Sequence, residues 1–150
     1  GSLSTSTSYE IRAGFQAMEL KELAMTISDS ALDLGALEVA SVKSDSANIM
    51  VTSTSDSGYT LAIGSADASP ITAVSDGAVT AGSEEYGVAV SGADKAFADD
   101  RSLIAGQVLA TAAVPVNGNP LTLTVKASRL STTSYGSKSQ NITLTLSANF

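Results

Sequence analysis

The sequence predicts an all-β fold, an antiparallel β-sandwich of immunoglobulin-like or jelly-roll type with about seven to ten strands. Apolar and polar residues alternate with a period of two wherever a period is visible, which is typical of strands with one buried and one wet face. Turn residues separate many of these runs at intervals near the ~8–12 residues expected between sandwich strands. The 150 residues are enough for one domain with a core of its own.

The first strand is expected at Leu20 to Ile27, after one irregular turn. A helix over Gly14 to Leu23 is the weaker alternative, because Glu19 and Glu22 would repel each other at their i,i+3 spacing. Four later runs show the same alternation of apolar residues: Tyr59, Leu61, Ile63; Tyr86, Val88, Val90; Leu121, Leu123, Val125; and Ile142, Leu144, Leu146, Ala148.

Two turn signals connect strands in the middle of the chain. Asp56-Ser57-Gly58 lies between the expected strands Ile49 to Thr54 and Tyr59 to Ile63, and predicts a β-hairpin. Asn117-Gly118-Asn119-Pro120 is expected to open the strand Leu121 to Ala127. Between these regions, the segment Asp94 to Thr111 fits either a short helix or an exposed loop, and the pattern does not decide between them.

The N-terminal residues 1–15 are expected to form an extended segment, and residues 16–150 a single sandwich domain. Ser2 to Ser8 is largely a Ser/Thr tract, whereas the residues after it alternate again. Such a segment is suited to pair with a sheet edge, either of its own chain or of a neighbouring copy. Its anchors to that edge are expected to be Leu3, Tyr9, Ile11 and Phe15.

The composition excludes several classes of function. Because the chain has no cysteine and no histidine, it cannot form Ser-His-Asp or Cys-His nucleophile systems or the usual zinc sites, and we expect no enzyme. With 15 acidic and 8 basic residues, it has too little positive charge to bind nucleic acid. No run approaches the ~18 apolar residues of a membrane helix, so no membrane span is expected.

Polarity in this chain comes mainly from hydroxyl groups. Serine and threonine make up 39 of the 150 residues, whereas charged residues make up 15%, below the ~25% typical of soluble domains. This composition, without cysteine and with few aromatic residues, favours an extracellular or cell-surface location. Gly1 and Ser2 resemble a cloning remnant or a processed end, so the lack of a signal sequence does not argue against export.

Carboxylates are the strongest acid, base or metal-binding groups available. Asp94, Asp99 and Asp100 lie close together in the sequence and supply the oxygen ligands that calcium prefers. The spacing is not that of an EF-hand, and a solvated acidic loop explains the three residues better. No cofactor is otherwise expected.

Three tyrosines, Tyr59, Tyr86 and Tyr135, stand next to a glycine. An exposed tyrosine can stack on a sugar ring in a binding module. Tyr59 and Tyr86, however, fall on the apolar side of their strands, which predicts buried rings with hydroxyl groups at the edge of the core.

The segment Thr54 to Ile63 carries the pattern G-Y-x-L-x-I, and Leu32-Asp33-Leu34-Gly35-Ala36-Leu37 carries L-x-x-G-x-L before it. With the late Tyr135-Gly136 turn and a last strand ending in Phe150, this order of motifs resembles exported β-sandwich surface proteins of bacteria. The chain is also broadly similar to fibre-forming matrix and pilus subunits. The resemblance implies a surface or structural role and nominates no catalytic residue.

We therefore expect an exported structural subunit of a filament that assembles with copies of itself by β-strand addition. The alternative is an adhesin module that binds a glycan or a host surface protein through loops at one end of the sandwich.

Overall fold

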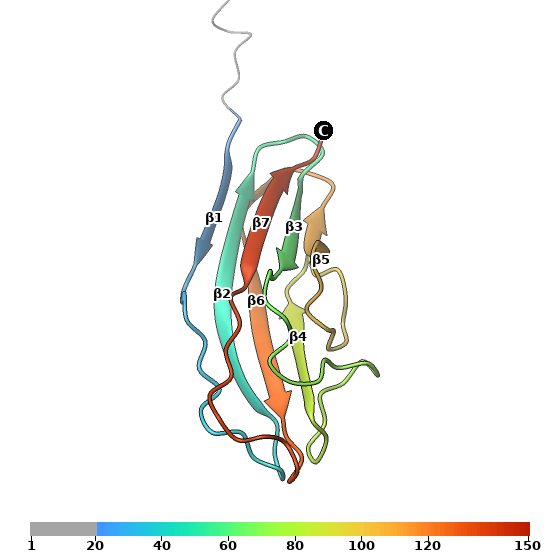
Figure 1. The fold of residues 1–150 in the computed structure, drawn as a ribbon. Helices are drawn as coiled ribbons and strands as arrows, with labels where there is room; N and C mark the ends of the chain where they lie inside the picture. The colour runs from blue at the N-terminus through green and yellow to red at the C-terminus, as the bar shows by residue number, and fades with distance from the viewer. Residues whose placement is uncertain (1–20) are drawn as a thin grey trace, which may run out of the picture.

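The computed structural model describes residues 21–150, which form seven β-strands in two antiparallel sheets. The four-stranded sheet has the order β1-β2-β6-β4 and the three-stranded sheet has the order β5-β3-β7, and the two sheets pack face to face (Figure 1). The predicted all-β antiparallel sandwich is thus confirmed. The strands are β1 (Leu23–Ile27), β2 (Lys43–Ser53), β3 (Tyr59–Gly64), β4 (Glu85–Ser91), β5 (Gln107–Ala112), β6 (Val116–Ser128) and β7 (Thr143–Ala148).

The core lies between the sheets and contains the residues that the alternation pattern selects, together with Phe97, Leu109 and Ala110, which the pattern did not identify. Ile49 and Val51 of β2 face Leu61 and Ile63 of β3, and all four side chains are buried. Tyr59 and Tyr86 are also buried, as predicted. Burial of one face of each strand accounts for the period-two pattern.

The Asp56-Ser57-Gly58 turn exists, but the prediction that it makes a β-hairpin is wrong. β2 and β3 belong to different sheets, so the turn carries the chain across the core. Gly58 has φ +75°, and a Cβ at this position would lie 2.1 Å from the carbonyl oxygen of Ala112. A hairpin and a crossing between sheets both bury one face of each strand, which is why the sequence pattern did not distinguish them.

The Asn117-Gly118-Asn119-Pro120 segment was also misplaced by the sequence analysis. It lies inside β6, which begins at Val116, and does not precede the strand. The register with β2 shifts between Val51 and Ser53, and Gly118 adopts φ +66° there while its N–H donates to the Thr52 hydroxyl at 3.0 Å. The turn residues therefore form an irregularity within a long strand.

The observed bounds of other strands also differ from the expected ones. The expected strand Leu20 to Ile27 is described from Leu23, and the strand expected to start at Ile49 starts at Lys43. Residues 94–106 form an irregular segment without a helix, and residues 107–111 belong to β5, where Leu109 and Ala110 are buried, so neither a short helix nor an exposed loop describes Asp94 to Thr111. Residues 1–15 and the expected start of the domain at residue 16 lie outside the described residues.

The four-stranded sheet is longer than the three-stranded sheet, because β2 and β6 span 11 and 13 residues whereas β3, β5 and β7 span 6 each. One end of its inner face therefore extends past the other sheet, and irregular segments cover it (Figure 1). Leu32, Leu34 and Leu37, from the connection between β1 and β2, pack against the core there. This is the structural role of the L-x-x-G-x-L motif.

Candidate assembly site at the open side of the sandwich

The sandwich has two sides at which sheet edges meet. β4 and β5 are the outermost strands on one side, and β1 and β7 are outermost on the other, where they contact each other (Figure 1). Outermost strands present unpaired backbone groups that can accept another strand, unless something covers them. The two sides differ in this respect.

The outer edge of β4 is covered by irregular segments of the same chain. Tyr86 exchanges backbone hydrogen bonds with Thr72 and Val74, each at 2.9 Å. Val88 exchanges two with Arg101, both at 2.8 Å. The backbone groups of these β4 residues that point away from β6 are therefore paired.

The outer edge of β5 is covered by the segment that follows β4. The Ala96 N–H donates to the Leu109 carbonyl at 2.8 Å, and the Thr111 N–H donates to the Asp94 carbonyl at 3.0 Å. Phe97 anchors this segment, because its side chain is only 5% exposed, and the Arg101 guanidinium lies 4.6 Å from the centre of its ring. We call the covered edges of β4 and β5 the closed side.

The three aspartates considered for calcium lie in this covering segment, and each has partners of its own. Asp94 accepts hydrogen bonds from the Tyr59 hydroxyl at 2.9 Å and the Asn119 amide at 2.8 Å. Burial and the Asp94 carboxylate together raise the pKa of Tyr59. The Tyr59 hydroxyl was predicted to reach the edge of the core, and Asp94 is the acceptor that it meets there.

Asp100 is largely buried and accepts the Lys126 ammonium at 2.7 Å and the Val79 N–H at 2.9 Å. Asp99 is more exposed and pairs with Arg101 at 2.9 Å, which lowers the pKa of its carboxyl. The structure gives the three carboxylates separate protein partners, and within residues 21–150 no group of three acidic side chains is placed to hold a metal ion. Their observed role is to fix the covering segment.

The outer edge of β1 has no such cover among residues 21–150. The Ser28 N–H donates to the Asn48 carbonyl and the Thr54 N–H donates to the Glu22 carbonyl, so the even-numbered residues bond toward β2. Because bonding residues alternate along an antiparallel ladder, the backbone groups of Leu23, Met25 and Ile27 point outward.

β7 shows the same arrangement in the other sheet. The Asn149 N–H donates to the Gly58 carbonyl, so the odd-numbered residues bond toward β3. The N–H and C=O groups of Leu144, Leu146 and Ala148 point outward, and no segment within the described part of the chain pairs with them. We call these edges of β1 and β7 the open side.

The residues with outward backbone groups also carry the apolar side chains of the open side. Their partners in register are buried core residues, so their side chains face inward between the sheets. They are nevertheless incompletely covered: Leu23 is 40% exposed, Ile27 is 43% exposed, and Met25, Leu144 and Leu146 are half-buried. An added strand would satisfy the backbone groups and cover these side chains together.

A cavity of about 930 Å³ continues the open side, between the end of the long sheet that extends past the other sheet and the irregular segments that cover it. Its floor is the inner face of that sheet, with Leu123 and Val125, and its walls include the leucines of the L-x-x-G-x-L motif and Ile142. Ile27 and Leu144 line the cavity and belong to the open side as well. The strip of apolar side chains is therefore continuous with the cavity, which has both apolar and polar lining residues.

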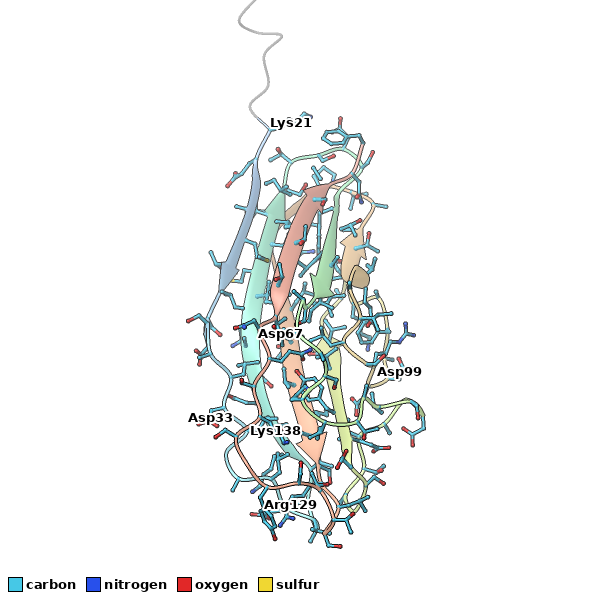
Figure 2. The ribbon with its side chains drawn as sticks, viewed as in Figure 1. Lys21, Asp33, Asp67, Asp99, Arg129 and Lys138 are labelled. Carbon is cyan, nitrogen blue, oxygen red and sulfur yellow. The ribbon has the colours of Figure 1, made fainter. Side chains whose placement is uncertain are left out.

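Polar residues lie around this cavity, at the end of the sandwich opposite Lys21 (Figure 2). The Arg129 Nε–H donates to the Leu37 carbonyl at 2.8 Å and fixes one wall. The Arg129 guanidinium also lies 5.9 Å from the ring centre of Tyr135, whose side chain is 89% exposed. Tyr135 is thus the exposed member of the three glycine-flanked tyrosines.

Sequence reasoning placed the assembly residues only at Leu3, Tyr9, Ile11 and Phe15, which lie outside the described residues. It missed the receiving surface, although the alternation in β1 and β7 had identified its apolar residues. The missing information was which strands lie outermost, since this depends on long-range pairing.

Comparison with models of protein families, with curated proteins and with solved structures finds no match to this chain. No helix in residues 21–150 is long and apolar enough to cross a membrane. The resemblance to bacterial surface proteins therefore stays a prediction.

Proposed function

We propose that this protein is an exported structural subunit that forms filaments by β-strand addition. The N-terminal segment of one copy pairs with the open side of the next. The observation that carries the proposal is the contrast between the two sides: one is covered by the chain's own segments, and the other presents outward backbone groups next to half-exposed apolar side chains.

The segment before β1 has the pattern that this surface would accept. Tyr9, Ile11, Ala13 and Phe15 alternate with more polar residues or glycine, so one face of an extended segment is apolar. Seven residues from Tyr9 to Phe15 span about 23 Å at about 3.3 Å each, and the six residues of β7 span about 20 Å. The lengths of the donor and the receiving edge therefore match.

The energy of such a contact is sufficient only if several anchors are buried. Complete burial of a large apolar side chain stabilises by about 1.5–3 kcal/mol, whereas association costs on the order of 4–15 kcal/mol. Three anchors, together with the newly covered Leu23 and Ile27, bring the gain into the range of the cost. A donor that repeats in every copy makes a non-closing, head-to-tail contact, which produces a filament and not a ring.

The test uses two full-length variants that each remove one half of the contact. Tyr9→Ser with Ile11→Ser removes donor anchors, and Ile27→Lys puts a charge into the receiving surface. Each variant alone should stay monomeric in sedimentation, because the chain of contacts stops at the first copy. Mixed together, they should form a stoichiometric dimer, since the donor of one and the acceptor of the other are intact.

The matched control is Thr26→Lys, which places the same charge on the opposite face of β1, where the side chain is exposed. It should polymerise like the parent chain. Absence of filaments from the parent chain in electron microscopy, or filaments from Ile27→Lys as abundant as those from Thr26→Lys, would refute the proposal.

A binding module remains the second candidate, favoured by exposed Tyr135 near the cavity. Its ring is suited to stack on a sugar or to contact a protein partner. A glycan array with the full chain tests the carbohydrate form of this function: binding that is lost in Tyr135→Ala would support it, and a structural subunit should bind no glycan.

A further inference from the structure

The apolar strip of the open side and the cavity form a channel with a defined direction. Ile27, at the end of β1, and Leu144, at the start of β7, line the cavity, whereas Leu23 and Ala148 do not. β1 therefore runs toward the cavity and β7 runs away from it, and the arrows in Figure 1 show that the two strands run in opposite directions.

The chain enters β1 at the other end of the molecule. Lys21 lies at the end of the sandwich opposite Arg129 and the cavity (Figure 2). A donor segment that leaves this end and meets a second copy stacked in the same orientation reaches the second copy at its cavity. The donor's later residues then lie at the cavity and its earlier residues lie farther along the channel.

A donor in this orientation runs antiparallel to β7 and parallel to β1. Every ladder between the named strands is antiparallel, and antiparallel pairing is slightly more stable per residue. The backbone of the donor should therefore bond to β7 and extend the three-stranded sheet to four strands. Its side chains would cover the half-exposed residues of β1.

We propose that the receiving site is this channel, an inference that rests on the proposed function. The N-terminal segment of a second copy adds antiparallel to β7, with Phe15 in the cavity. In the register that uses every apolar position, Tyr9, Ile11, Ala13 and Phe15 lie opposite Ala148, Leu146, Leu144 and Ile142. The small Ala13 then faces the large Leu144, and the aromatic Phe15 occupies the widest part of the channel.

Donation from a second copy fits the sequence better than insertion into the same chain. To enter its own channel, the segment would have to reverse direction between Phe15 and Lys21. Residues 16–21 are Gln, Ala, Met, Glu, Leu and Lys, and none of these is a residue that favours tight turns.

Engineered disulfides test the direction, because the chain contains no cysteine of its own. Solvent-facing positions are used so that no buried residue is replaced: in the proposed register Glu10 lies opposite Ser147, and both Ser147 and Thr143 are exposed. Such pairs, between ladder bonds, have Cα atoms about 4.5 Å apart, which suits a disulfide. Glu10→Cys with Ser147→Cys should give a covalent ladder of oligomers on oxidation.

The control for the opposite direction is Glu10→Cys with Thr143→Cys, and the control for the closed side is Glu10→Cys with Val108→Cys on β5. A ladder from either control that exceeds the ladder from the predicted pair would overturn the inference. So would a disulfide confined to single chains, or filaments in which the predicted pair does not cross-link. These results concern filaments that do form, whereas failure of the parent chain to polymerise refutes the proposed function itself.

A second measurement tests whether Phe15 lies in the cavity. The chain has no tryptophan, so Phe15→Trp introduces a single reporter into the full-length protein. Its emission should shift to shorter wavelength on assembly, as water leaves the ring, and Leu34→Asp in the cavity wall should weaken assembly. Filaments in which the tryptophan stays fully exposed to solvent would contradict the placement of Phe15.

Discussion

The closed and open sides are built from the same kind of strand but end differently. On the closed side, residues 92–101 contact both sheets through backbone hydrogen bonds, and Phe97 and Asp100 hold the segment in place. On the open side, β1 and β7 present outward backbone groups and half-exposed leucine and isoleucine side chains. The difference shows that an outermost strand is not in itself an assembly site, because the chain can cover its own edges.

The largest effect on folding is expected from Phe97→Ala on the closed side. Truncating a buried phenylalanine leaves a cavity and should lower the free energy of unfolding by about 3–5 kcal/mol. Ile27→Ala, on the open side, should cost about 1 kcal/mol, because the side chain is already 43% exposed. Urea unfolding of both full-length variants under monomeric conditions compares them. Equal losses would mean that the two sides are equally important to the core.

A smaller loss is expected from Asp100→Ala. This change leaves the Val79 N–H and the Lys126 ammonium without their acceptor in a largely buried position, which should cost about 2–3 kcal/mol. Asp99→Ala is the control, because it removes a neighbouring carboxylate whose ion pair with Arg101 is exposed, and little change is expected. Thermal unfolding of the two variants should separate them, and a larger loss for Asp99→Ala would contradict the assigned roles.

Tyr59→Phe should have a smaller effect than Asp100→Ala at neutral pH, about 1–2 kcal/mol, from loss of the hydrogen bond to Asp94. Its main effect concerns alkaline pH. The pKa of Tyr59 is raised in the folded state, so the stability that the neutral phenol contributes is complete below about pH 10 and is lost as pH rises above that value. The free energy of unfolding of the variant should therefore fall less than that of the parent chain as the pH rises from about 9 to about 12. Urea unfolding of both proteins at intervals of about one pH unit measures this difference. A steeper alkaline loss in the variant would contradict this account.

Several strands were predictable, since β3 and β7 were identified to within one or two residues from alternation alone, but β5 was missed because it lies in the segment expected to be a helix or a loop. Pairing was not predictable. The Asp56 to Gly58 turn has the same local chemistry whether it joins neighbours or crosses the core, and the Asn117 to Pro120 turn residues were absorbed by the register shift in β6. These outcomes depend on contacts between residues far apart in the sequence.

The candidate site was predictable only in part, for the same physical reason. The donor pattern at Tyr9 to Phe15 is local and visible in the sequence. Whether an edge is open depends on where an irregular segment lies, and residues 94–106 have no periodicity that predicts their path. Asp94, for example, suggested a metal ligand by composition, whereas its observed partners are Tyr59 and Asn119.

Hydrogen–deuterium exchange of the full chain, compared between monomer and filament, tests the central claim most directly. The amides of Val88, Ala96 and Arg101 on the closed side should be protected in both states, because they are already bonded. The amides of Leu144, Leu146 and Ala148 should exchange rapidly in the monomer and become protected in the filament. A filament that leaves these three amides unprotected, or gains its new protection on the closed side, would contradict the account.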